Sequence, residues 1–208
     1  TEEIAADQGA PIDRTGFDAE MERQRERARA AWKGGPDEES SPLYRAILDE
    51  RGPTDFVGYE RVESAGTILA LVRDGETLEG IDEGESAEVF LDRTPFYAEA
   101  GGQIGDTGII YTETGTLRVE DTRHAVQGLH GHRATATSGS IRVGQEATLR
   151  VDADRRERIR KSHTGTHLLH WALRDVLGTH VHQAGSLVAD GRLRFDFSHY
   201  AALDPMEL

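Results

Sequence analysis

Residues 162–199, SHTGTHLLHWALRDVLGTHVHQAGSLVADGRLRFDFSH, hold a helical pattern followed directly by a strand pattern. The helical part begins upstream, where Asp152 or Asp154 can cap a helix N-terminus, and it ends at Gly178, a residue typical of a helix C-terminus. The strand part alternates apolar and polar residues on both sides of a turn at positions 190–191, as in a β-hairpin. A helix followed by an antiparallel hairpin predicts an α+β unit.

Two histidines of the predicted helix, His163 and His167, are four residues apart and therefore lie on one helix face. Such a pair can place two imidazole nitrogens on one metal ion, as in helical zinc sites. No Glu follows His163, which excludes the HExxH protease motif. Pairs at this spacing also occur by chance, so metal binding and simple packing both stay open. We interpret the other histidines of this region as structural or surface side chains: His170, His180, His182 and His199.

Short alternating or β-branched runs, separated by glycines, fill residues 55–152. Several short strands with no helical pattern between them predict an antiparallel barrel or sandwich. The expected strands are 67–74, 86–92, 108–112, 116–121, 128–137 and 146–152.

One segment of this region, TPFYAEAGGQIGDTG (94–108), does not fit a strand. Its four glycines within eight residues indicate positive φ or close backbone approach, and polar side chains such as Gln103 lie among them. The pattern is typical either of tight turns between strands or of a loop that faces a ligand. Gln103 is accordingly either a turn-capping amide or a ligand-facing one.

The N-terminal part predicts two helices and a linker. Residues 13–33 are rich in helix formers, residues 34–42 form a polar linker, and residues 43–51 predict a short helix that ends at Gly52-Pro53. We therefore divide the chain into a helical lead-in with its linker (1–54), a β-rich domain (55–152) and a second, α+β region (153–208).

Composition excludes several classes of protein. The 208 residues contain no apolar run near the about 18 residues that a membrane helix needs, and the polar N-terminus is no signal peptide. Cysteine is absent, which excludes a disulfide framework, a thiol nucleophile and a Cys-ligated zinc site built from this chain alone. A cytosolic protein fits these features. Because the first residue is Thr and not Met, we expect a piece of a longer protein.

A net charge of -14 argues against a protein that coats nucleic acid non-specifically, since phosphate neutralisation requires clustered Lys and Arg. Residues 150–208 differ from the rest, because they carry nine basic and eight acidic side chains. Their basic cluster is either an RNA-contacting surface or a solvated helix face. The cluster includes Arg156, Arg158, Arg160 and Lys161.

Two stretches together resemble a known family. Residues 162–199 are similar to the start of the editing core of alanyl-tRNA synthetase, which is shared with the free-standing AlaX editing proteins. Residues 94–108 resemble the Gly-rich loop that precedes that core. Residues 12–29 are similar to the helix that leads into the editing half of the synthetase, a helix that AlaX proteins lack, so the synthetase is favoured. The resemblance covers nearly the whole chain, most weakly in 34–65.

The resemblance implies a fold and a metal. Residues 55–152 would form a translation-protein β-barrel, and residues 153–208 would begin the editing domain. A zinc ion would be held by His163 and His167, together with a Cys-x-x-x-His pair farther downstream that this chain does not contain. The usual Ala of the first histidine motif is Gly165 here, a change that puts no ligand in doubt.

The resemblance also implies an activity, the hydrolysis of Ser or Gly wrongly esterified to the tRNA for alanine. Gly101 and Gly102 would line the site in the Gly-rich loop. The hydroxyl or amide groups that could hold the aminoacyl group, a water or the serine hydroxyl belong to Thr166, Gln183 and Gln103. The acceptor-stem phosphates would meet Arg156, Arg158, Arg160 and Lys161.

Charging of tRNA with alanine, with ATP and Mg²⁺, is implied only for an aminoacylation domain that would precede residue 1. Two other functions stay open. The chain could be a free-standing AlaX-type deacylase, or a non-catalytic RNA-docking barrel in which the histidines only pack.

Overall fold

In the computed structural model we describe Gly16, Arg23 and residues 41–204. By their contacts, residues 1–35 and residues 36–208 form two separate compact units. The helix predicted at 13–33 lies outside the described residues except for Gly16 and Arg23, which are both helical. The predicted linker also lies outside them, apart from its last two residues.

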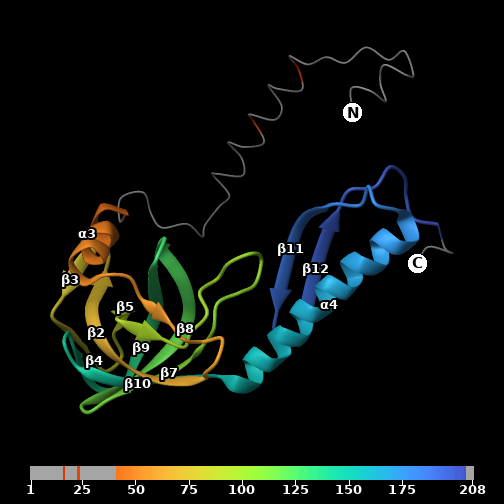
Figure 1. Cartoon of the computed structure of the whole chain (residues 1–208). Coiled ribbons are helices and arrows are strands. Elements are labelled where there is room, and N and C mark those ends of the chain that lie inside the picture. Colours follow the sequence, from red (N-terminus) through yellow and green to blue (C-terminus); the bar gives the residue numbers. More distant parts are fainter. Residues whose placement is uncertain (1–15, 17–22, 24–40, 205–208) are drawn as a thin grey trace. The chain divides into compact units, whose positions relative to one another are not determined.

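Six antiparallel strands close into a barrel (Figure 1). The last strand of the ring pairs with the first, so every barrel strand has a partner on both of its edges. This closure makes the fold a barrel and not a sandwich. In ring order the strands are β2 (Glu63–Arg73), β5 (Ser86–Leu91), β9 (Leu129–Arg142), β8 (Gly115–Val126), β7 (Gly108–Thr112) and β10 (Glu146–Val151).

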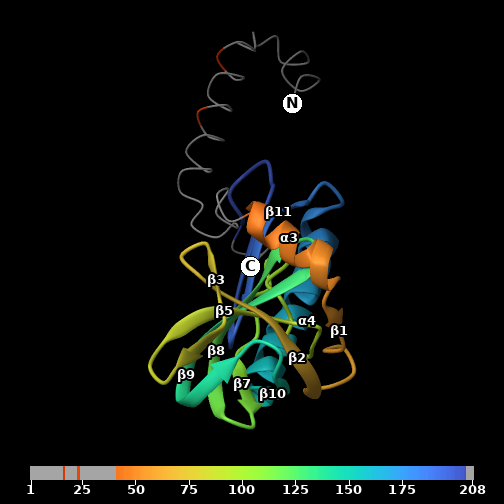
Figure 2. The ribbon, with the colours of Figure 1, turned by 90° about the vertical axis from the view of Figure 1, so that its left-hand side faces the viewer.

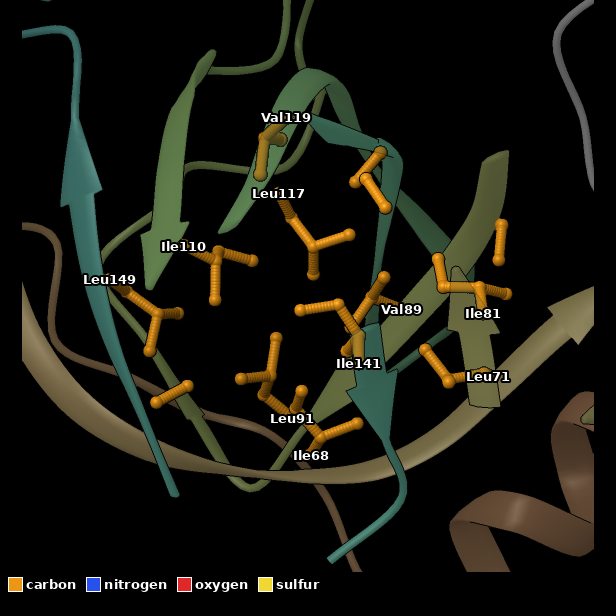
Figure 3. Close-up of a cluster of buried hydrophobic side chains, with 14 of the residues drawn as sticks. Ile68, Leu71, Ile81, Val89, Leu91, Ile110, Leu117, Val119, Ile141 and Leu149 are labelled. Carbon is orange, nitrogen blue, oxygen red and sulfur yellow. The ribbon is translucent and has the colours of Figure 1, made fainter. Parts of the chain in front are cut away.

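The barrel core is built from inward-facing residues of the strands, and the alternation that places them is clearest in β10. In β10, Ala147, Leu149 and Val151 are buried while the residues between them are exposed. Figure 3 shows the inward side chains of the different strands meeting in the barrel interior. Each fully buried Leu or Ile side chain stabilises the fold by about 1.5–3 kcal/mol.

Shorter elements surround the barrel. Two of the four short strands extend the barrel sheet, because β3 (Glu76–Leu78) pairs with β2 and β4 (Gly80–Asp82) pairs with β9. The other two, β1 (Asp55–Phe56) and β6 (Arg93–Thr94), pair in parallel with each other as a separate two-stranded sheet. The sequence did not predict these strands, because two or three residues carry no periodicity.

The helix predicted at 43–51 is confirmed as α3 (Ser41–Arg51), which lies against one side of the barrel (Figure 2). Tyr44 and Ile47 pack against Phe90 and Leu129 in a second buried cluster. The helix ends at Gly52, which has a φ of 82° and donates its N–H to the carbonyl of Leu48.

The predicted long helix and hairpin are also confirmed. Helix α4 (Ala153–Leu177) is capped by Asp152, whose carboxylate accepts from the backbone N–H of Arg155, and it ends at Gly178. Strands β11 (Gln183–Ala189) and β12 (Arg192–Phe197) pair in antiparallel fashion and pack on α4 (Figure 1). No helix in the described part of the chain is long and apolar enough to cross a membrane.

The hairpin covers the α4 face that carries Gly165 and His170. A Cβ at Gly165 would lie 3.2 Å from a methyl carbon of Leu193, and the His170 ring lies 5.0 Å from the Phe195 ring. The small side chain at 165 therefore permits close packing of helix and hairpin. On the other side of α4 the Trp171 side chain is 67% exposed.

Two buried histidines lie within the barrel wall. The His132 ring is fully buried, with its nitrogens 2.8 Å from Thr94 Oγ1 and 2.9 Å from the Val89 carbonyl oxygen. Burial lowers the pKa of His132 to about 3, and burial together with the nearby His124 lowers the pKa of His130 to about 4. Both rings are therefore neutral in the folded protein at pH 7.

We predict that the chain loses stability between pH 7 and pH 5. In the unfolded chain both histidines regain a pKa near 6.5 and take up protons that the folded state does not bind. Their contribution is fully present above about pH 6.5 and is lost as the pH falls toward 4. The free energy of unfolding in urea should fall by about 2 kcal/mol for each histidine from pH 7 to pH 5. A His130→Gln variant should lose about half of this pH dependence, and an unchanged slope would contradict the assignment.

Candidate functional site

A buried ion pair ties the Gly-rich loop, residues 94–108, to the first turn of α4. The side chain of Asp106 is 2% exposed and that of Arg156 is 11% exposed. Arg156 donates from Nε to Asp106 Oδ2 at 3.1 Å, and its Nη2 donates to the same oxygen. The remaining donors of Arg156 bind the carbonyl oxygens of Gly58 at 3.0 Å and Pro95 at 2.5 Å. This side chain is therefore committed to holding the loop on the helix.

The same loop is joined to the hairpin through its backbone. Val188 donates its N–H to the Gly102 carbonyl at 2.7 Å, and Ile104 donates to the Val188 carbonyl at 3.1 Å. A Cβ on Gly102 would lie 2.5 Å from the carbonyl oxygen of Ser186, so only glycine fits here without displacement. Arg155 on α4 also binds the loop, by donating to the Gly105 carbonyl at 2.9 Å.

A tight turn at the tip of the loop presents Gln103. Ala100 and Gln103 exchange backbone hydrogen bonds of 3.2 and 2.9 Å across Gly101 and Gly102. These two glycines have φ values of 59° and 82°, the signs that a type I′ turn requires. The loop thus contains a tight turn, as one interpretation of its sequence requires, and the tip of this turn lies against α4. The ligand-facing interpretation stays a prediction.

The histidine pair lies where this turn meets α4. His163 Nε2 is 3.0 Å from His167 Nε2, and both side chains are exposed. Gln103 Oε1 lies 2.7 Å from His163 Nδ1. The structure therefore brings together three predicted site residues from two segments that are 60 positions apart. We call this group the histidine–glutamine cluster.

The other two predicted pocket residues, Thr166 and Gln183, form hydrogen bonds outside this cluster. Thr166 is buried, and its hydroxyl donates to the Ser162 carbonyl at 2.9 Å within the helix. Gln183 is exposed at the start of β11, and its amide donates to Ser186 Oγ at 3.0 Å. Since Ser186 lies directly against Gly102, Gln183 reaches the Gly-rich loop through one intervening side chain.

The predicted RNA-contacting residues fall into two groups. Arg156 is engaged as described, and Arg158 forms an ion pair with Asp190 in which Nη2 donates to Oδ2 at 2.9 Å. The hydrogen bond from Arg158 lowers the pKa of the Asp190 carboxyl. Arg160 is exposed, with Glu157 3.5 Å away, and Lys161 is exposed without an ion pair among the described residues. RNA contact by the buried Arg156 would require its pair with Asp106 to break, whereas the Arg158 side chain is half exposed in its pair with Asp190.

The donor set of the histidine–glutamine cluster fits part of a zinc site. Two imidazole nitrogens that converge from positions i and i+4 are typical zinc ligands. Within residues 41–204 no group of three or more His, Cys, Asp and Glu side chains could hold a metal ion. The described chain therefore offers two of the usual four ligands, His163 and His167.

Two residues that build the site, Asp106 and Ser186, were not among the predicted site residues, and Arg155 belongs to the basic cluster that was predicted to meet RNA. Asp106 and Arg155 bind across the contact of loop and helix, and Ser186 lies against Gly102, but a charged or hydroxyl side chain has no periodicity that would mark such a role. The ion pair between positions 106 and 156 is visible only when the two segments meet in space.

The chain is similar to known proteins along its whole length. The model of the family described as tRNA synthetases class II (A) matches residues 1–155. The whole chain is 50% identical to the alanine–tRNA ligase of Geobacillus kaustophilus, 49% identical to that of Paracoccus denitrificans, and 48% identical to that of Solibacter usitatus. In each case the chain spans about a quarter of the relative's length, 23–24%. The resemblance found in the sequence is thereby confirmed.

We predict that Arg156→Met destabilises the chain by about 3–5 kcal/mol, because it leaves the Asp106 carboxylate buried without its partner. The double variant Asp106→Asn with Arg156→Met should recover part of this loss, since no buried charge remains. The free energy of unfolding in urea measures both effects.

Arg158→Met provides a matched control, because it removes the same side chain from an exposed ion pair two residues away. It should cost no more than about 1 kcal/mol. Equal losses in Arg156→Met and Arg158→Met would show that the Asp106–Arg156 pair does not hold the loop.

Proposed function

The chain belongs to the class II tRNA synthetase (A) family, and on this premise we propose that it contributes to the editing half of an alanine–tRNA ligase. In this proposal residues 55–152 are a translation-protein-like barrel and residues 153–208 begin the editing core. The reaction is hydrolysis of Ser or Gly wrongly esterified to tRNA(Ala). The observation that carries the proposal is the convergence of His163 and His167 beside Gln103.

The comparisons support a ligase more than a free-standing deacylase. The family match begins at residue 1 and so includes the lead-in that AlaX proteins lack, and the ligase relatives match the chain along its whole length. Charging of tRNA with alanine, with ATP and Mg²⁺, would then belong to other parts of the full-length protein. The cytoplasm, where translation uses charged tRNA, is the proposed location.

The proposed reaction adds water to the ester carbonyl and breaks the bond to the ribose oxygen, which leaves a free amino acid and a tRNA hydroxyl. His163 and His167 would hold a zinc ion, which when bound supplies a Lewis acid for the carbonyl or a binding site for the amino acid's polar groups. Gln183 has its amide at the surface beside the loop, where its carbonyl oxygen can accept a hydrogen bond from the serine hydroxyl.

Discrimination against correctly charged alanine follows from the same polar group. A site that binds the serine hydroxyl leaves its polar partner unpaired when alanine occupies the pocket, which disfavours hydrolysis of the correct product. Gln183 is better placed for this role than Thr166, because Gln183 is exposed whereas Thr166 is buried in α4. We propose that Thr166 Oγ1 is a second acceptor for the same serine hydroxyl.

For the RNA itself we propose contacts from Arg160 and Lys161. Both side chains are exposed on the turn of α4 that precedes the histidine pair, and a cation there can contact acceptor-stem phosphates without dismantling a buried pair. Such contacts position the tRNA and carry no sequence specificity.

We predict that His163→Ala with His167→Ala, in a full-length alanine–tRNA ligase that carries these residues, slows hydrolysis of Ser-tRNA(Ala) by about a hundredfold or more. Charging with alanine should be unchanged, because the aminoacylation site would be separate. Deacylation of purified Ser-tRNA(Ala) and alanine charging are measured on the same preparations.

His182→Ala is the matched control, since His182 is an exposed histidine outside the histidine–glutamine cluster. It should deacylate at the normal rate. If the double variant also clears Ser-tRNA(Ala) at the normal rate, the hydrolytic proposal fails and the non-catalytic RNA-docking barrel becomes the better interpretation.

A further inference from the structure

We infer that Gln103 is a positioning residue that fixes the tautomer of His163 and so presents its Nε2 atom, bare of a proton, to a metal ion. This inference deepens the proposed function and rests on it for the identity of the metal. It assigns to Gln103 a role through His163 in place of direct contact with the aminoacyl group.

The first step is the hydrogen bond between the two side chains. An amide oxygen can only accept, so the 2.7 Å contact of Gln103 Oε1 with His163 Nδ1 requires a proton on Nδ1. A neutral imidazole carries one N–H, and the Nε2 atom of His163 is therefore a bare acceptor. That is the form in which a histidine binds a metal through Nε2.

The second step concerns His167. Its Nε2 lies 3.0 Å from the Nε2 of His163, a distance that needs one proton between the two nitrogens. Since His163 Nε2 is bare, that proton belongs to His167, which donates it to His163. In the metal-free protein the two histidines are thus in opposite tautomers, and only His167 must move its proton to Nδ1 before both can act as ligands.

The third step is the rigidity of Gln103. Its own N–H and carbonyl are fixed by Ala100 across the two-glycine turn, and the residues on either side of it bind Val188 of the hairpin. The loop beyond it is held by the ion pair of Asp106 with Arg156. A second-sphere partner works by restraining the ligand, and this backbone network supplies the restraint.

The amide also joins two parts of the fold that are distant in the sequence. His163 lies on α4, whereas Gln103 lies on the loop between β6 and β7 of the barrel region. The barrel therefore does more than carry the editing core: its loop sets the state of one of the ligands.

The test is nuclear magnetic resonance of the 208-residue chain with ¹⁵N-labelled histidine rings, in which long-range ¹H–¹⁵N correlations show which nitrogen bears the proton. We expect His163 to be protonated at Nδ1 and His167 at Nε2. Zn²⁺ alone is then titrated into the same samples, and His167 should change tautomer while His163 keeps its Nδ1 proton.

Two substitutions at Gln103 and one control separate positioning from a merely structural role. Gln103→Leu should abolish the preference of His163 for the Nδ1 proton and weaken Zn²⁺ binding about 10–100-fold. Gln103→Glu keeps an acceptor at the same place and should preserve both. Gln127→Leu makes the same change at an exposed glutamine of the β8–β9 turn and should leave both readouts unchanged.

The outcomes distinguish this inference from the proposed function. Protonation of His163 at Nε2 in the unaltered chain, or an unchanged tautomer in Gln103→Leu, overturns the inference even if editing requires the histidines. If instead the tautomers are as expected but the double histidine variant still edits normally, the positioning role stands and the proposed function fails.

Discussion

The buried ion pair between Asp106 and Arg156 is the contact on which the site depends. It joins a loop of the barrel to the first turn of α4. Both side chains are buried, so removal of either one alone leaves the other as an unpaired buried charge. Arg156 also binds the carbonyl oxygen of Pro95 in the same loop and that of Gly58 in a second segment, so one guanidinium fixes the direction in which α4 leaves the barrel. A buried pair of this kind is weak evidence for net stability. Its role in the geometry follows here from the further hydrogen bonds of Arg156.

Glycine makes the rest of that geometry possible. The turn that presents Gln103 needs two consecutive residues with positive φ, and the second of these lies so close to Ser186 that no side chain fits. The loop backbone can then pair with Val188 of the hairpin. The Gly-rich sequence therefore does not make a mobile loop here, because its glycines permit a set of close contacts that other residues would prevent.

The elements of the fold were predictable wherever apolar residues recur at the spacing of a strand or a helix. The six barrel strands have alternating or β-branched runs, and α4 has good caps. The helix begins and ends beside Asp152 and Gly178, as those residues indicate. The two histidines on one face also followed from helical geometry alone. The closure of the barrel did not, since strand order depends on pairings such as that of β10 with β2, which no local pattern specifies.

In the predicted site, too, the sequence indicates local features but not the contacts between distant segments. The basic residues at 155–161 look alike in the sequence, but the structure divides them into two groups. Arg155, Arg156 and Arg158 bind the loop or the hairpin. Arg160 and Lys161 are exposed to solvent. Charge density along a chain therefore cannot separate cations that build a site from cations that meet a ligand. What separates them is the partner, and each partner here lies more than 30 positions away. The same reasoning applies to Gln103, whose role follows from one hydrogen bond to α4 and not from its place among glycines.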